Sequence, residues 1–293
     1  MRPLQPTLAV LEPGGGLGVV SRGQGDAWVD DRWNERLLRL DRRTGRVVAR
    51  IPVQGRLALS DGARGVWALQ SGGGYGRALR GPLLRIDPST NRVMARIPLP
   101  ALGFGLVPHG DVVWVWGPRD LLRIDARTDT LAQVIHVPDA LGETTGFALI
   151  GDQPVITTAD RHLVRFDPRT GAQVATVPLA LDVPVLQQAS AGRAVVVSRG
   201  TVAMVDPASG ELLWQHRLGF RIGTVLQVRG ALWVQGAYIR DPGDRIWQLD
   251  PDTGATLGSA LLPAFGSMAM AAVDDALWVT TASGRVLVLP LPS

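Results

Sequence analysis

The chain has 293 residues, of which 46% are hydrophobic and 19% charged, so it is long and apolar enough to bury a sizeable core. It contains no cysteine, which excludes disulfides, thiolate metal sites and cysteine nucleophiles. No apolar run is long enough to cross a membrane, and the first residues lack the pattern of a signal peptide. As written, the sequence predicts a soluble cytoplasmic protein without membrane insertion, or an extracytoplasmic one if a signal or anchor has been removed.

The charge is unusual in kind and in distribution. All 30 basic residues are arginine, and the net charge is +4. Residues 1–100 hold 16 arginines against 8 acidic residues, whereas residues 101–293 hold 14 against 18. The first third therefore carries an arginine excess that favours an anionic partner.

One hairpin pattern recurs along the chain: an apolar strand ends in Asp, a short turn follows, and a second strand begins. Asp accepts hydrogen bonds from the turn, Pro presets its second position, and Gly or Asn takes the positive φ at its end. The turn aspartates are Asp41, Asp87, Asp125, Asp167, Asp206 and Asp250. A tryptophan marker precedes four of these turns, at Trp28, Trp67, Trp114 and Trp233, and Val155 and Val195 stand in its place before the other two. The marker recurs at Trp278, after the last turn. We expect the marker residues to pack between neighbouring repeats.

The period near 40 residues, with four short strands in each repeat, is typical of a β-propeller. The sequence therefore predicts an all-β fold and one domain over residues 1–293, a seven-bladed propeller of four-stranded blades. The predicted blades are residues 16–53, 54–99, 100–138, 139–179, 180–218, 219–262 and 263–293. Residues 7–13 resemble a fourth strand, so we expect them to complete the last blade and close the ring.

The repeats resemble known bacterial propellers. The matching segments are the tryptophan marker, RIDPSTNRVMARIPL at Arg85–Leu99 and RFDPRTGAQVATVPL at Arg165–Leu179. They look like YVTN and pyrroloquinoline-quinone-like (PQQ-like) repeats and like the virginiamycin B lyase superfamily. Those families include enzymes, sensor domains and scaffolds, so the resemblance implies the fold more narrowly than the function.

The lyase resemblance implies a divalent metal held by His and Glu where each chain segment enters an innermost strand. The corresponding residues here include no histidine: Leu17, Leu57, Phe104, Thr145, Val185, Gly223 and Met268. The four histidines of the chain are scattered without metal-ligand spacing, so no residue is assigned as a metal ligand.

Loops on one face of the predicted propeller are the candidate binding site. Three connections between second and third strands are expected to be enlarged: Asp30–Arg36, Gln70–Pro82 and Gln235–Arg245. Arginine and aromatic residues on such loops suit a small anionic molecule or an acidic protein surface, although ordinary solvated loops would carry them too. The candidate ligand-binding residues are Arg32, Trp33, Tyr75, Arg77, Arg80, Arg221, Tyr238 and Arg240.

Two functions remain open from the sequence. The first is a monomeric binding module that presents these loops to a ligand or partner. The second is a lyase, isomerase or cyclase acting on a small metabolite at the axial mouth, with Glu143, Asp160 and Asp182 as candidate catalytic acids and Mg²⁺ or Ca²⁺ as a cofactor they could hold. Nucleic acid is not the expected partner, because the arginines of residues 36–50 span two strands and a turn without an aromatic stacking platform.

Overall fold

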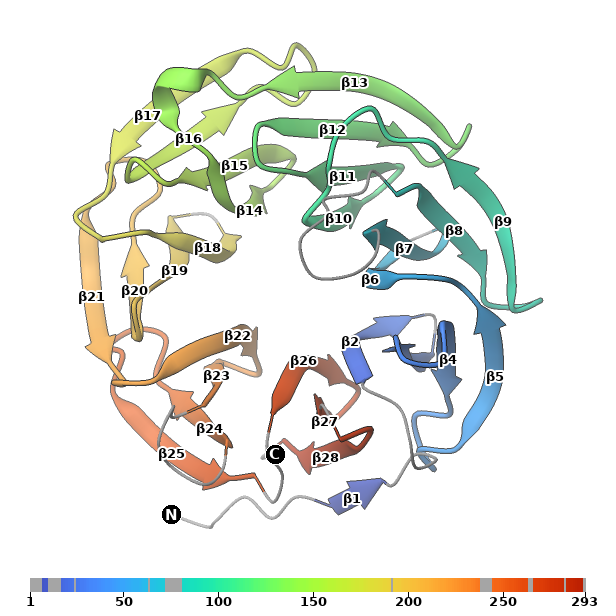
Figure 1. Cartoon of the computed structure of the whole chain (residues 1–293). Helices are drawn as coiled ribbons and strands as arrows, with labels where there is room; N and C mark the ends of the chain where they lie inside the picture. The colour runs from blue at the N-terminus through green and yellow to red at the C-terminus, as the bar shows by residue number, and fades with distance from the viewer. Residues whose placement is uncertain are drawn as a thin grey trace. The chain divides into compact units, whose positions relative to one another are not determined.

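A computed structural model describes residues 7–9, 17–23, 25–62, 64–71, 81–190, 192–237, 244–262, 266–281 and 283–291. Within these residues lie twenty-eight β-strands and one 3-10 helix, η1 (Asp139–Leu141). No helix among them is long and apolar enough to cross a membrane. The fold is therefore built almost entirely from strands and tight turns (Figure 1).

The strands form seven four-stranded antiparallel sheets, one for each predicted blade. Three sheets follow chain order early in the sequence: β2 (Leu17–Gly23), β3 (Asp26–Asp31), β4 (Arg36–Leu40), β5 (Val47–Pro52); β6 (Arg56–Gly62), β7 (Gly65–Ser71), β8 (Leu83–Asp87), β9 (Arg92–Ile97); and β10 (Gly105–His109), β11 (Val112–Trp116), β12 (Asp120–Asp125), β13 (Thr130–His136). Three more follow: β14 (Thr144–Ile150), β15 (Gln153–Thr158), β16 (His162–Phe166), β17 (Gln173–Pro178); β18 (Val185–Ser190), β19 (Arg193–Ser198), β20 (Thr201–Val205), β21 (Leu212–Arg217); and β22 (Arg221–Val228), β23 (Ala231–Ala237), β24 (Asp244–Leu249), β25 (Thr256–Leu261).

The seventh sheet combines the two ends of the chain. Its order is β1 (Thr7–Ala9), β28 (Val286–Pro290), β27 (Ala276–Thr281) and β26 (Ser267–Val273). Strand β1 runs antiparallel to β28, with Thr7 opposite Val288 and Ala9 opposite Val286. The N-terminal strand thus supplies a fourth strand to this sheet; residues 10–13 of the predicted strand lie outside the described residues. The predicted all-β, seven-bladed propeller fold is confirmed.

The chain divides into two compact units. Unit 1 contains Pro118–Leu121 and Gln133–Leu261, and unit 2 contains Arg2–Gly117, Leu122–Ala132 and Leu262–Ser293. In unit 2, Trp28 of β3 is fully buried against Val66 and Leu84 of the next sheet. Trp278 of β27 packs in the same way against the β2–β5 sheet, where it contacts the cluster containing Leu38. These tryptophans therefore belong to the core between sheets, as the sequence predicts.

The recurring turns have the predicted hydrogen bonds. Oδ1 of Asp41 accepts from the backbone N–H of Thr44 at 2.7 Å, and the carbonyl of Asp41 accepts from the N–H of Gly45 at 2.8 Å. Gly45 has φ +69° and Asn91, at the same place in the second sheet, has φ +56°. The turn Asp, with its hydrogen bonds, and the left-handed residue at the end of the turn explain why this short motif recurs.

An arginine on the third strand of a sheet holds the turn of the next sheet. Arg39 of β4 bonds to Asp26 at 2.5 Å and to Oδ1 of Asn91 at 3.0 Å, and it also donates to the carbonyl of Pro88. Arg85 of β8 takes the same role one sheet later, with Asp129 at 3.0 Å. Part of the arginine excess of the early sheets is therefore used to join neighbouring sheets within unit 2.

Candidate binding site at the Trp33 turn

The loop between β3 and β4 is a tight turn, not the enlarged loop that the sequence predicts. Strand β3 continues to Asp31 and β4 begins at Arg36, so only residues 32–35 connect them. This connection is only one or two residues longer than residues 117–119, 159–161 and 199–200, which join the same strands in three other sheets. The sequence overestimates it because the strands extend into a segment that contains charged residues.

Asp31 organises this turn from inside the protein. Its side chain is 2% exposed, and its carboxylate accepts from Nδ2 of Asn34 at 3.0 Å and from Nε of Arg36 at 2.6 Å. The backbone N–H of Asn34 also donates to the carbonyl of Asp31 at 3.2 Å. Glu35 takes φ +49°, and its carbonyl accepts from the N–H of Val53 at 3.0 Å. These bonds fix the turn in one conformation.

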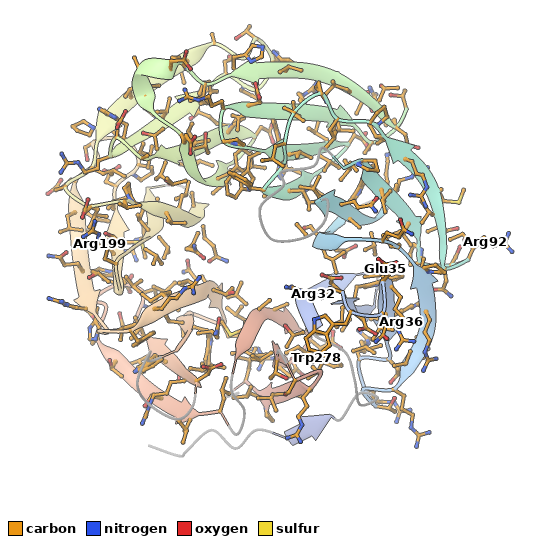
Figure 2. The ribbon with its side chains drawn as sticks, in the orientation of Figure 1. Arg32, Glu35, Arg36, Arg92, Arg199 and Trp278 are labelled. Atoms are coloured by element: carbon orange, nitrogen blue, oxygen red, sulfur yellow. The ribbon has the colours of Figure 1, made fainter. Side chains whose placement is uncertain are left out.

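Asp30 forms a longer ion pair with the first residue of the turn. It is 1% exposed, and its carboxylate lies 3.7 Å from Nε of Arg32. The positive charge of Arg32 is therefore balanced inside the protein, which weakens its predicted role in binding an anion. Figure 2 shows Arg32, Glu35 and Arg36 beside the β2–β5 sheet.

Trp33 stands at the tip of this turn and is 71% exposed. The marker tryptophans, such as Trp28 and Trp278, are by contrast almost completely buried. A large indole that remains in water on a rigid turn is the kind of side chain that contributes most at protein interfaces. Of the predicted ligand-binding residues, Trp33 is the one whose surroundings in unit 2 best fit binding.

A second exposed aromatic residue of unit 2 was not among the predicted site residues. Phe104, just before β10, is 50% exposed and its ring meets the ring of Trp116 edge-on, with centroids 5.6 Å apart. Its backbone N–H donates to the carbonyl of Trp116 at 2.7 Å. In a propeller, connections that enter first strands share a face with those between second and third strands. Phe104 and Trp33 thus lie on connections of the same face. The sequence signal for the Phe104–Trp116 pair is the second tryptophan, two residues after the marker Trp114.

Five other predicted ligand-binding residues lie outside the described residues. These are Tyr75, Arg77, Arg80, Tyr238 and Arg240. Arg221 is described: it is exposed and begins β22, opposite Ala237 of β23. Their roles in binding stay predictions.

The three candidate catalytic acids are all exposed in unit 1 but have different neighbours. The carbonyl of Glu143 accepts from the N–H of Ala159 at 2.8 Å, so Glu143 and Asp160 lie on adjoining segments of one sheet. Asp182 belongs to the next sheet and pairs with Arg199 at 2.9 Å. Among the described residues, no three His, Asp or Glu side chains gather as metal ligands. The enzyme hypothesis and its Mg²⁺ or Ca²⁺ stay predictions.

A set of buried polar residues that lie at the ends of the second strands was not predicted from the sequence. They follow the tryptophan marker, or its valine substitute, by two or three positions. In unit 2 they are Asp30, Asp31, Thr280 and Thr281, and in unit 1 they are Thr157, Thr158, Ser198 and Gln235. The spacing from the marker would have revealed them in the sequence. Only in the first sheet are both positions carboxylates, which is why that turn can hold two arginines.

Comparison with protein families adds the type of repeat. Residues 159–291 match the model of a PQQ-like family described as outer membrane protein assembly factor BamB. The chain is a seven-bladed propeller, and its residues 159–291 resemble PQQ-like, BamB-type repeats. This confirms the PQQ-like part of the expected resemblance, whereas the YVTN and virginiamycin B lyase parts stay predictions. None of the curated proteins compared with the chain matches it.

Several solved structures share the fold. BamB from Moraxella catarrhalis is 16% identical, with 94% of this chain and 85% of that one covered and a TM-score of 0.63. The computationally designed Ika8 protein is 14% identical, with coverage of 96% and 98% and a TM-score of 0.68. A chain of the Mitotic Checkpoint Complex is 10% identical, with coverage of 100% and 94% and a TM-score of 0.74. At these identities the likeness shows the fold alone.

Proposed function

We propose that this protein is a scaffold that binds another protein through the Trp33 turn. The observation that carries the proposal is the 71% exposure of Trp33 on a turn held by hydrogen bonds to the buried Asp31. Because the turn is already ordered, binding loses little conformational entropy there, and the indole can be buried at full benefit. Phe104 supplies a second exposed aromatic side chain, on a connection of the same face.

The type of partner follows from the charge balance of the turn. Arg32 and Arg36 each have an aspartate partner, so an anionic small molecule would have to compete with Asp30 and Asp31. An aromatic tip on a turn whose arginines are already paired suits a protein surface with an apolar pocket.

The BamB-type repeats support this function and suggest a location. The family model is described as an assembly factor for outer membrane proteins, and an assembly factor works by contacting other proteins. By this likeness we infer that the chain functions outside the cytoplasm, associated with the outer membrane. This inference replaces the cytoplasmic location that the sequence as written suggests.

Affinity enrichment from an envelope extract of the native host tests the proposal. We expect Trp33→Ser to weaken capture of a specific partner by about 30-fold, the loss typical of an interface hot spot, while Trp33→Phe keeps most of it. Leu213→Ser on β21 is the matched control, because it removes an exposed apolar side chain elsewhere. All three variants should melt normally. Equal capture by Trp33→Ser and Leu213→Ser would refute the proposed site.

A further inference from the structure

Two outer strands of unit 2 present the same exposed pattern of side chains. Strand β9 exposes Arg92, Met94 and Arg96, and its other residues face inward. The segment before and within β5 repeats it, with Arg46, Val48 and Arg50 exposed. Met94 is 57% exposed and Val48 54%. An apolar side chain with an arginine two residues away on either side therefore faces solvent twice.

The arginines of β9 differ from most arginines of the early sheets. Arg39 and Arg85 are bound to aspartates and to backbone carbonyls. Within the described part of the chain, the side chains of Arg92 and Arg96 have no hydrogen-bond or ion-pair partner. Figure 2 shows Arg92 pointing away from the ribbon into solvent. These two charges are available to a partner.

The backbone of β9 is available as well. It is the last strand of its sheet, and among the strands that the structure describes it pairs only with β8, with Leu84 opposite Arg96 and Asp87 opposite Arg92. Alternate residues of such an edge strand point their N–H and C=O groups away from the sheet, where another strand can pair with them. The hydrogen bond from Arg39 to Asn91 anchors the turn that precedes β9, so this edge is held in place.

Edge protection alone does not explain these arginines. Charged side chains commonly keep sheet edges from aggregating. Yet β17 exposes Val174, and β25 exposes Leu257, without an arginine on either strand. If arginine served only to guard exposed apolar residues, these strands would need it equally.

We propose that the outer edge of β9 accepts an extended acidic segment of a partner protein as a fifth strand. The segment would place an apolar residue opposite Met94 and carboxylates two residues to either side, opposite Arg92 and Arg96. Backbone hydrogen bonds would supply the pairing, and the two guanidinium–carboxylate pairs would select the sequence. The β9 edge is a different surface from the Trp33 turn, so an experiment can refute either proposal without refuting the other.

The absence of cysteine allows a direct test with the whole chain. The Met94→Cys variant carries a single thiol, which is offered the peptide Glu-Thr-Cys-Thr-Glu or Lys-Thr-Cys-Thr-Lys as its thionitrobenzoate disulfide. The protein thiolate attacks the peptide sulfur, a protein–peptide disulfide forms, and thionitrobenzoate leaves and is measured by its absorbance. We expect the acidic peptide to be captured about tenfold faster, and the preference to vanish with Arg92→Ser and Arg96→Ser. Val174→Cys on β17 is the matched control and should show no preference.

Backbone methylation separates strand pairing from simple charge attraction. Two acidic peptides, each N-methylated on one alternating set of residues, keep the same charges. Strand addition predicts that one of them loses the rapid capture. If both keep it, the arginines merely attract acids and the proposal is wrong. It is also overturned if the two unmethylated peptides react equally, or if Arg92 and Arg96 are needed only for binding anionic phospholipid vesicles.

Discussion

Two adjacent aspartates define the most distinctive feature of this protein. Asp30 and Asp31 are buried at the end of a strand, and each neutralises an arginine of the following turn. The cost of burying a carboxylate is offset only when a partner cation and hydrogen bonds are in place. The result is a hydrogen-bonded turn that keeps the Trp33 side chain exposed to solvent.

Removing one of these carboxylates should destabilise the fold strongly. We expect Asp31→Ala to lower the free energy of unfolding by about 2–4 kcal/mol, because Arg36 and Asn34 lose a buried acceptor. Asp139→Ala is the matched control: its ion pair with Arg119 is equally short at 2.5 Å, but Asp139 is 93% exposed, so the loss should stay below about 1 kcal/mol. Urea unfolding measures both. Equal losses would mean that the Asp31 network contributes no more than a surface pair.

Residue roles were only partly predictable from the sequence. The buried marker tryptophans follow from their period, and Trp33 is recognisable because it falls outside that period. The partners of Arg32 and Arg36 could not be predicted, because an alternating pattern of charged residues does not show which side chain points inward at the end of a strand. That is also why the loop was expected to be longer.

At the level of elements, the hairpin turn is the best predicted feature. Asp167 accepts from the N–H groups of Thr170 at 2.7 Å and Arg169 at 2.8 Å, as the repeated motif requires. These bonds stabilise the charged carboxylate and hold the pKa of Asp167 below its ordinary value. Backbone hydrogen bonds from Thr253 and Asp252 lower the pKa of Asp250 in the same way.

The turns should make the protein sensitive to acid. The folded pKa lies below the unfolded value for Asp41, Asp87, Asp125, Asp167 and Asp250. Each of these aspartates therefore adds stability above about pH 4, and this contribution is lost as the pH falls through the folded pKa. The melting temperature should therefore drop below about pH 4. Asp167→Asn keeps an acceptor oxygen but cannot titrate, so its melting temperature should fall less steeply. A variant with the same acid slope as the wild type would count against this role for the turns.

At the scale of the whole molecule, the regular period predicted seven sheets, and the structure has them. The meaning of the arginine excess was harder to predict. Several arginines of unit 2 form ion pairs with aspartates of the same chain, such as Arg42–Asp274 and Arg64–Asp111. Sequence spacing cannot reveal these pairs, because the partners lie far apart in the chain. The excess therefore overstates the charge offered to a partner, and the exposed arginines of β9 are a better guide.

Photo-cross-linking at position 33 tests most directly whether the Trp33 turn contacts a partner. A photoreactive phenylalanine analogue replaces Trp33 in the full chain expressed in its native host, and the same analogue replaces Leu213 as an exposed control. The account predicts one discrete protein adduct from position 33 on irradiation and none from position 213. No adduct from position 33, or the same adducts from both positions, would contradict it.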